Sequence, residues 1–316
     1  MDFLINSKLG IFFAVLRGLN ICNLNFFLNM RQRSITGILF AAVVIPSMLY
    51  SPYTFMLLYL VVAVIGHVEY GKMLYPNDLF KNVRIVLSLL PTVALLLLNA
   101  YLFQSHGWWH VSSDYNSVML LYLQLFAFGV WLFFLLILEL YSRTPLPFEM
   151  VGKMALSFFY ICIPVVCLYN LAFYPKGFSP QLPLALMLMV WANDVFAYLI
   201  GSQIGRTKLF ERISPKKTWE GSIGGFICCM ITGYIIGIYM PQWGYTHLSP
   251  SQWLIFGAVC SLFGTLGDLV ESMLKRSVGV KDSGTLLPGH GGVLDRFDAY
   301  FFVAPWAFIL FFIFFS

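Results

Sequence analysis

Acidic and basic side chains gather in two stretches of an otherwise apolar chain, residues 193–225 and 267–298. Together the two stretches hold eight of the 14 acidic residues and nine of the 19 cationic ones. The acidic members are Asp194, Glu211, Glu220, Asp268, Glu271, Asp282, Asp295 and Asp298. Carboxylates mixed with cations at the ends of apolar segments are typical of a site that holds both a metal ion and a polyanion.

The carboxylates of the second stretch lie at the ends of two consecutive apolar segments. Asp268 ends one segment, and Ser272 and Lys275 follow it at i+4 and i+7, so one helical face should present all three to the cytoplasm. Asp295 and Asp298 fall in the first turn of the next segment, spaced i, i+3 on one helical face. A helix dipole favours carboxylates at that end. Carboxylates from two helix ends can converge on Mg²⁺, which usually takes one or two of them together with substrate phosphates. We therefore predict that Asp268, Asp295 and Asp298 bind a metal ion. The alternative is a helix cap, or an ion pair with Lys275 or Arg296.

One acidic residue, Asp194, falls inside an apolar segment, about 10 Å from the end of that segment at about 1.5 Å per residue. An ionisable group within a membrane span is costly and marks a functional candidate. We expect Asp194 to face a substrate site. A hydrogen-bonded packing role beside Asn193 is the alternative.

The cations of the two stretches could neutralise a nucleoside triphosphate together with a lipid phosphate. The candidates are Lys216, Lys217, Lys275, Arg276, Lys281 and Arg296. Any one of them alone could instead contact anionic lipid headgroups. Gly289, Gly291 and Gly292 would let backbone N–H groups approach phosphate oxygens closely. His290 fits a phosphate donor or loop anchor better than a proton acceptor. No Walker A pattern occurs, which argues against a P-loop kinase or ATPase.

The elements that position these residues must be membrane spans. The chain is 59% hydrophobic and only 10% charged, whereas soluble domains average roughly 25% charged residues. Uncharged runs long enough to cross ~30 Å of hydrocarbon recur along it. We predict an all-α polytopic membrane protein with about nine transmembrane helices. The helices are expected near residues 36–50, 53–68, 83–103, 117–138, 153–173, 182–200, 220–240, 252–267 and 297–315.

The loops between these segments predict the orientation. All but one of the 19 Lys and Arg residues fall on one side of the predicted membrane, the exception being Lys176. The positive-inside rule then puts the N-terminus in the cytoplasm and the C-terminus outside. We therefore expect a multi-pass protein of the cytoplasmic (inner) membrane whose site faces the cytoplasm.

Three regions follow from this pattern. Residues 1–30 form an N-terminal extension, where a mis-assigned start upstream of Met30 or an interfacial helix is favoured over a cleaved signal peptide. Residues 31–180 form an N-terminal transmembrane region, and residues 181–316 form a C-terminal catalytic transmembrane region. The six cysteines lie nearly all in apolar segments without metal-binding spacing, so we interpret them as small buried side chains.

The second polar stretch resembles the signature of the phosphatidate cytidylyltransferase family throughout. The matching residues are Ser272, Lys275-Arg276, Lys281-Asp282, Gly284, Gly289-His290-Gly291-Gly292, Asp295-Arg296 and Asp298. Ser214–Gly221, followed by Gly224-Gly225, resembles a second block of the family, and Asn193-Asp194 with Ala197, Tyr198 and Gly201 resembles a third. Val195-Phe196 departs from the commoner small residues of that third block. The resemblance covers roughly residues 30–316, strongly beyond residue 190 and by hydropathy alone before it.

The resemblance implies an enzyme that condenses CTP with phosphatidic acid to give CDP-diacylglycerol and pyrophosphate in phospholipid biosynthesis. It implies Mg²⁺ at Asp268 and Asp295, with a second, monovalent ion plausible, and a homodimer; no nucleic-acid partner is expected. Catalysis is assigned to Asp268, Asp295 and Lys281. Substrate binding is assigned to Asp194, Ser214, Lys216, Lys217, Thr218, Glu220, Ser272, Lys275, Arg276, Asp282, His290, Gly291, Gly292 and Arg296.

Two other classes of protein remain open at this point. A sister enzyme could use CTP with another lipid phosphate, or a CTP-dependent lipid kinase could phosphorylate a polyprenol or phytol. The intact signature argues against the kinase. A transporter is the non-enzyme alternative, but transporters tend to have broken helices near the midplane and pseudo-symmetric halves. Here the charges lie at one membrane face in one half of the chain.

Overall fold

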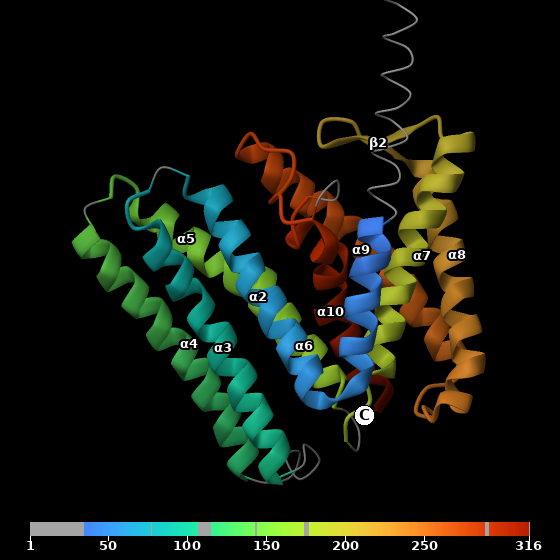
Figure 1. The fold of residues 1–316 in the computed structure, drawn as a ribbon, viewed down its shortest axis with the longest axis horizontal. Helices are drawn as coiled ribbons and strands as arrows, with labels where there is room; N and C mark the ends of the chain where they lie inside the picture. The colour runs from blue at the N-terminus through green and yellow to red at the C-terminus, as the bar shows by residue number, and fades with distance from the viewer. Residues whose placement is uncertain are drawn as a thin grey trace, which may run out of the picture.

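The computed structural model describes residues 35–76, 78–106, 115–142, 144–173, 177–287 and 291–315 (Figure 1). Side chains are described throughout these ranges except at 102–106, 115–124 and 315. The predicted extension 1–30 lies outside the described residues, as do Lys176, Gly289 and His290.

Helices make up nearly all of the described structure. After a first helix, Ile35–Tyr50, they are α2 (Pro52–Leu74), α3 (Lys81–His106), α4 (Tyr115–Ser142), α5 (Pro147–Ser157), α6 (Ile163–Leu171), α7 (Gln181–Ile204), α8 (Trp219–Tyr239), α9 (Pro250–Ser277) and α10 (Leu294–Phe315). A π-helical turn, Phe158–Cys162, joins α5 to α6 into one continuous rod, and a 3-10 turn, Met240–Trp243, extends α8.

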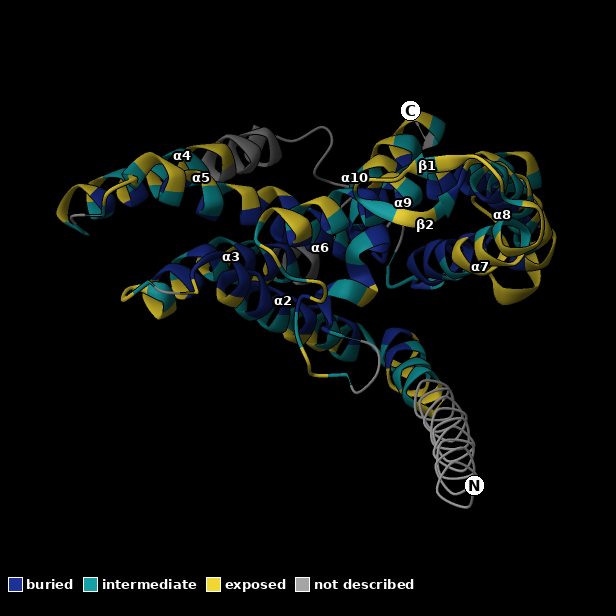
Figure 2. Ribbon diagram, turned by 90° about the horizontal axis from the view of Figure 1, so that it is seen from above, coloured by how far each residue is buried: buried dark blue, intermediate teal, exposed yellow. Residues whose placement is uncertain are grey.

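Eight of these rods are long and apolar enough to cross a membrane, counting Pro147–Leu171 as one; Ile35–Tyr50 is a shorter apolar helix. Eight of the nine predicted segments coincide with these rods, and the segment predicted at 36–50 coincides with the shorter helix, so the count of nine spans stays a prediction. Large apolar side chains such as Leu97, Phe133 and Ile231 are exposed on their outer faces, and Figure 2 shows exposed residues along the outside of the helices. Contiguous apolar surface of this extent is unsuited to water and suited to lipid. The prediction of a helical, multi-pass membrane protein is confirmed.

Helix boundaries follow local capping signals. The Ser51 hydroxyl accepts a hydrogen bond from the Thr54 N–H, and Pro52 occupies the first turn of α2. Ser249 and Gln252 form the same kind of capping box at α9, again with a proline, Pro250, in the first turn. Such caps satisfy N–H groups that a helix start leaves unpaired, and proline fits the first turn because its missing N–H is not needed there. The turn after Tyr50 therefore separates two antiparallel helices.

The C-terminal helices α7, α8, α9 and α10 pack in succession. Glycines permit this closeness: a Cβ on Gly221 would lie 2.7 Å from the carbonyl oxygen of Ala197, and one on Gly257 would lie 2.6 Å from that of Cys229. Small residues at membrane-helix interfaces allow backbones to approach in this way. The described cysteines are all free, and three of them, Cys162, Cys229 and Cys260, are buried.

A short antiparallel hairpin links α7 to α8, formed by β1 (Lys208–Phe210) and β2 (Ser214–Thr218). The all-α prediction omitted it, because this polar segment lacks the alternation of apolar residues that marks a strand. The hairpin lies at the same end of the helices as the segment between α9 and α10 (Figure 1). Both polar stretches of the sequence therefore meet at one face of the bundle.

The N-terminal helices join this core through α6 and α2, which both lie beside α10. The hydroxyls of Tyr59 and Tyr300 are 3.1 Å apart, and the Tyr300 hydroxyl donates to the carbonyl oxygen of Pro183 at 2.8 Å. A separate buried ion pair joins α3 to α4, where the Arg84 guanidinium donates twice to the Glu139 carboxylate, at 2.7 and 2.8 Å.

Candidate active site

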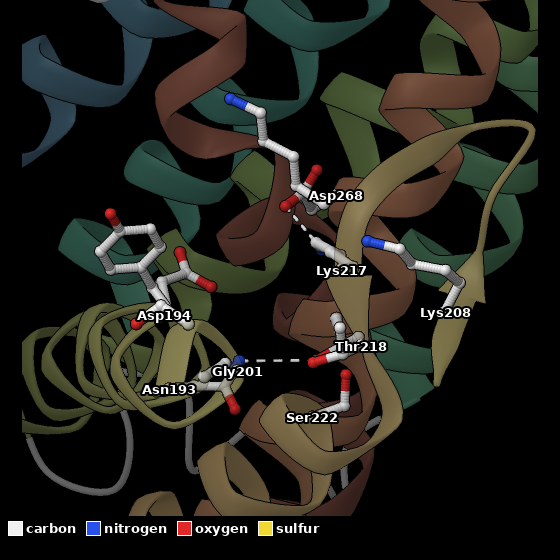
Figure 3. A pocket seen from close by; sticks show the side chains of 13 residues that line it. Asn193, Asp194, Gly201, Lys208, Lys217, Thr218, Ser222 and Asp268 are labelled. Carbon is white, nitrogen blue, oxygen red and sulfur yellow. Dashed lines mark hydrogen bonds and ion pairs between the residues drawn. The ribbon is translucent and has the colours of Figure 1, made fainter. Parts of the chain in front are cut away.

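A cavity of about 520 Å³ opens between α7, the hairpin, α8 and α9. Five residues that the sequence predicted for the site line it: Asp194, Lys216, Lys217, Thr218 and Asp268. Figure 3 shows Lys208 and Lys217 extending from the hairpin, with Asp268 and Asp194 contributed by the helices. The sequence analysis assigned no site role to the other polar lining residues, which are Asn193, Tyr198, Ser202, Lys208, Ser222 and Thr265. The cavity thus combines three lysines with two carboxylates.

Asp268 is the carboxylate that meets the hairpin cations. Its Oδ2 lies 2.6 Å from Nζ of Lys217, and both side chains are partly exposed, at 33% and 25%. The Ser272 hydroxyl, one turn further along α9, donates to Oδ1 of Asp268 at 3.3 Å. This i, i+4 contact is the one expected from the sequence spacing. Asp268 is therefore oriented by two neighbours and still reachable from the cavity.

Asn193 and Asp194 are adjacent in sequence but have different surroundings. Asn193 is buried; its Oδ1 accepts from the Ser261 hydroxyl at 2.5 Å, and its Nδ2 donates to Thr265 at 3.5 Å. These bonds join α7 to α9. Asp194 is exposed to the cavity, where it lies within electrostatic range of Asp268 and Lys217. The packing role considered for Asp194 is carried by Asn193.

Asp295 belongs to a second polar cluster, whose other acidic member is the fully buried Glu271. Nζ of Lys275 lies 2.5 Å from Glu271 and 2.6 Å from Asp295. The Asp295 carboxylate, 6% exposed, also accepts from the N–H groups of Ser283 at 2.9 Å and Gly292 at 2.7 Å. This is the ion pair with Lys275 considered from the sequence, combined with a cap on the first turn of α10. The prediction that Asp295 binds a metal ion stays a prediction.

Asp298 lies one turn further along α10, beside α9. Its Oδ1 accepts from the N–H of Ala299 at 2.7 Å, and its carboxylate is close enough to Asp268 and Asp194 for electrostatic repulsion. Close helix packing brings these groups together, because a Cβ on Gly267 would lie 3.0 Å from the backbone oxygen of Asp298. Asp268 of α9 and Asp298 of α10 are thus within electrostatic range of each other, and their binding of a metal ion stays a prediction.

The donor set fits a cation shared with a substrate better than a closed protein cage. Within the described part of the chain, no three His, Cys, Asp or Glu side chains are grouped so as to hold a metal ion. Mg²⁺ usually takes one or two carboxylates and completes its shell with water and phosphates. Mutual repulsion among Asp194, Asp268 and Asp298 would be relieved by such a cation.

Other predicted residues lie outside the cavity lining. Glu220 accepts from the backbone N–H groups of Arg206 at 3.1 Å and Thr207 at 3.0 Å, so it holds the start of the hairpin. Thr218, by contrast, has two roles. It lines the cavity, and its hydroxyl caps α8 by accepting from the Gly221 N–H at 3.2 Å. Arg276 donates to the carbonyl oxygen of Val280 at 3.0 Å. The remaining members outside the lining are Ser214, Lys281, Asp282 and Arg296.

The glycines of the second stretch have contacts that the sequence did not predict. Gly291 has a positive φ of 82°, which favours glycine, and its carbonyl oxygen accepts from the Leu287 N–H at 2.9 Å. The N–H of Gly292, expected to bind phosphate, instead donates to Asp295.

Glu69 of α2 is the main residue missed by the sequence analysis. It is 6% exposed and accepts from the N–H groups of Val293 at 3.0 Å and Leu294 at 2.8 Å, and from the Ser283 hydroxyl at 3.2 Å. A signal was available, since Glu69 directly follows the predicted span 53–68 and is thus a carboxylate at the end of an apolar segment, as Asp268 is. Its partners, more than 200 positions away in the chain, could not be read from local spacing.

Comparisons with known proteins identify the family of the chain. A model of the cytidylyltransferase family matches residues 31–314. Proteins named phosphatidate cytidylyltransferase are similar: that of Staphylococcus haemolyticus is 33% identical over 281 residues, which is 87% of this chain and 96% of the relative. That of Staphylococcus aureus is 48% identical over 120 residues, 37% of this chain and 44% of the relative. That of Synechocystis is 43% identical over 134 residues, 42% of this chain and 44% of the relative. The matches of higher identity therefore span less than half of those relatives.

Proposed function

The chain belongs to the cytidylyltransferase family, and from that premise we propose that it is a phosphatidate cytidylyltransferase. It would transfer the cytidylyl group of CTP to phosphatidic acid, releasing pyrophosphate. The observation that carries this proposal is the polar cavity of about 520 Å³, where Lys208, Lys216 and Lys217 lie beside Asp194 and Asp268 at one end of the membrane helices. That position suits a water-soluble triphosphate that must meet a lipid headgroup.

In the proposed reaction an oxygen of the lipid phosphate attacks the α-phosphorus of CTP. A new P–O bond forms to the lipid phosphate while the bond between the α-phosphorus and the bridging oxygen breaks, and pyrophosphate leaves with that oxygen. A phosphomonoester with a second pKa of about 6 is mostly dianionic at neutral pH. The nucleophile therefore needs no strong general base, and the protein's task is to align and neutralise two polyanions.

The cavity residues can divide this task. The ammonium groups of Lys208, Lys216 and Lys217 would bind phosphate oxygens as point charges. Asp268, with Asp295 or Asp298 from α10, would hold Mg²⁺. When bound, that ion would neutralise phosphate charge during transfer. Binding of the triphosphate would also require Lys217 to exchange its bond with Asp268 for one with phosphate.

The membrane arrangement is part of the proposal. We infer nine spans, with Ile35–Tyr50 as the first, a cytoplasmic N-terminus and an external C-terminus in the cytoplasmic membrane. Support comes from the cations, which gather in the hairpin and in the segment between α9 and α10, at one end of the helices. A homodimer and a second, monovalent ion remain expectations from the family resemblance.

The test is a defined assay with the purified full-length chain, Mg²⁺, labelled CTP and phosphatidic acid in mixed micelles. A labelled CDP-lipid together with pyrophosphate would support the proposal. Parallel reactions with other lipid phosphates, and with polyprenol or phytol, identify the alternatives, because a kinase releases CDP and labels the lipid only from γ-labelled CTP. Label in none of these lipids, from a monodisperse sample, would overturn the assignment.

A further inference from the structure

Glu69 does not line the cavity, yet it holds the segment that leads into α10. Its carboxylate accepts from two backbone N–H groups, of Val293 and Leu294, and from the hydroxyl of Ser283. We propose that Glu69 is a positioning residue for the reaction, which anchors residues 283–284 and 291–294 to α2 and so sets the position of Asp295. The role in the reaction rests on the proposed function.

The chemistry of the contact favours a specific anchor. Glu69 is 6% exposed, and burial of a carboxylate is costly unless hydrogen bonds compensate. All three described donors are neutral groups, and two of them, the N–H groups of Val293 and Leu294, lie at the start of α10, where the helix dipole adds positive potential. Hydrogen bonds to a charged acceptor are roughly twice as strong as neutral ones. The contact therefore favours a single arrangement of the segment.

The backbone of the segment is shaped to receive this carboxylate. A Cβ on Gly284 would lie 2.6 Å from Oε1 of Glu69, and one on Gly292 would lie 2.5 Å from Oε2. Real Cβ atoms essentially never approach that closely. Glu69 thus occupies the space where a side chain at Gly284 would be, and the Glu69 carboxylate and the Ser283 hydroxyl together occupy that space at Gly292.

Ser283 connects the anchor to the predicted site. Its hydroxyl donates to Glu69, while its N–H donates to Asp295. Asp295 in turn contacts Lys275 of α9 at 2.6 Å. One continuous set of hydrogen bonds thus runs from α2 through Ser283 and Asp295 to α9. Removing the acceptor on α2 would release the segment and let the Asp295 carboxylate shift.

The test compares Glu69→Gln with Glu139→Gln. Glu139 is an equally buried carboxylate, also 6% exposed, but it pairs with Arg84 between α3 and α4. Both variants lose one buried charge. Both variants also replace an accepting carboxylate oxygen with an NH₂ that cannot accept. Only in Glu69→Gln do the donors that lose their acceptor belong to the segment leading into α10.

For Glu69→Gln we expect kcat to fall roughly tenfold or more, with the KM for CTP changed less than about threefold, because the cavity itself is intact. Hydrogen exchange of peptides covering residues 283–297 should speed up, while exchange in α7 and α8 should not. Glu139→Gln should lower the thermal midpoint at least as much but leave kcat per folded molecule and exchange at 283–297 near the values of the parent protein.

Two results would overturn the proposal: unchanged kcat and exchange in Glu69→Gln, or equal losses of kcat in the two variants. If Glu69→Gln does not fold, Ser283→Ala removes only the hydroxyl that donates to Glu69. It should show the same changes in kcat and exchange to a smaller degree, and no change in either would also overturn the idea. Absence of CDP-lipid synthesis in the parent protein would overturn the proposed function instead, and the exchange data would still decide whether Glu69 anchors the segment.

Discussion

Lys217 of β2 and Asp268 of α9 lie 2.6 Å apart at the edge of the cavity, with all of α8 between them in the sequence. The contact joins the two polar stretches, which sequence spacing could not place relative to each other. It also pairs the Asp268 carboxylate with a cation of the protein itself. A divalent ion at Asp268 would compete with this ammonium group, so metal affinity and triphosphate binding should be linked.

Asp268→Asn and Asp295→Asn should each lower turnover by several orders of magnitude, because the charge that would hold Mg²⁺ is lost while the shape is kept. If the two carboxylates act as one unit, the double variant should be little worse than either single one. Rates measured against Mg²⁺ concentration distinguish metal ligation from helix capping. A variant that has lost a metal ligand needs a higher Mg²⁺ concentration for half-maximal rate, whereas a variant that has lost only a helix cap does not. Glu211→Gln, at an exposed residue of the hairpin turn, is the control. Near-normal metal dependence in both single variants would remove the metal assignment.

Lys208→Met should raise the KM for CTP by roughly tenfold, the effect of losing about 1.4 kcal/mol of ground-state binding. Lys208 lines the cavity and would provide one of its three ammonium groups for the triphosphate. Arg212→Met is the matched control, because Arg212 lies on the same hairpin, is exposed and does not line the cavity. Initial rates over a range of CTP concentrations give kcat and the KM for CTP of each variant. Equal effects of the two substitutions would mean that only the net charge of the hairpin matters.

Glu139→Gln should destabilise the protein by about 3 kcal/mol, because it leaves the Arg84 guanidinium buried without its charged partner on α4. Arg84 also contacts Asp78, which limits the loss. Thermal unfolding in detergent, followed by intrinsic tryptophan fluorescence, measures the change. A midpoint equal to that of the parent protein would show that the ion pair makes no net contribution to stability.

The proposed orientation predicts which single cysteines an impermeant thiol reagent labels in intact cells. Thr246→Cys, in the exposed connection between α8 and α9, should react. Thr285→Cys, exposed between α9 and α10, should react only after the cells are opened. Thr285 is a better probe than Ser283, which is 8% exposed and bonded to Glu69. Labelling in the reverse pattern would contradict cytoplasmic access for CTP.

The sequence predicted what depends on composition and short-range spacing. Hydropathy located the spans, and the i, i+4 spacing predicted the contact between Ser272 and Asp268. The i+7 spacing also predicted that Lys275 is presented to the cytoplasm, but Lys275 is buried, with its ammonium group against Glu271 and Asp295. Glu271 has a fully buried side chain. Its burial depends on how α9 packs, which no local pattern encodes.

Longer-range relationships account for the rest of what was missed. Lys208 enters the cavity only because an antiparallel hairpin turns the chain back beside Thr218. Glu69 reaches the start of α10 only because α2 lies beside that helix. In both cases the residue type was visible in the sequence, but its partner is set by tertiary packing.

The opposite surroundings of Asn193 and Asp194 have a consequence for the rotation of α7. Asn193 is bonded to Ser261 on α9, so it fixes the angle at which the helix presents its neighbouring residue to the cavity. An α-helix turns by about 100° per residue. Inserting one alanine in α7 just before Asn193 would rotate the residues before the insertion by about 100° relative to those after it. The helix could then keep either the Asn193–Ser261 bond or the packing of residues 181–192, but not both. An alanine inserted after Gly201 instead, nearer the hairpin, would leave the orientation of Asp194 toward the cavity unchanged. A scan of single-residue insertions along α7 would thus map where the angular position of this helix matters.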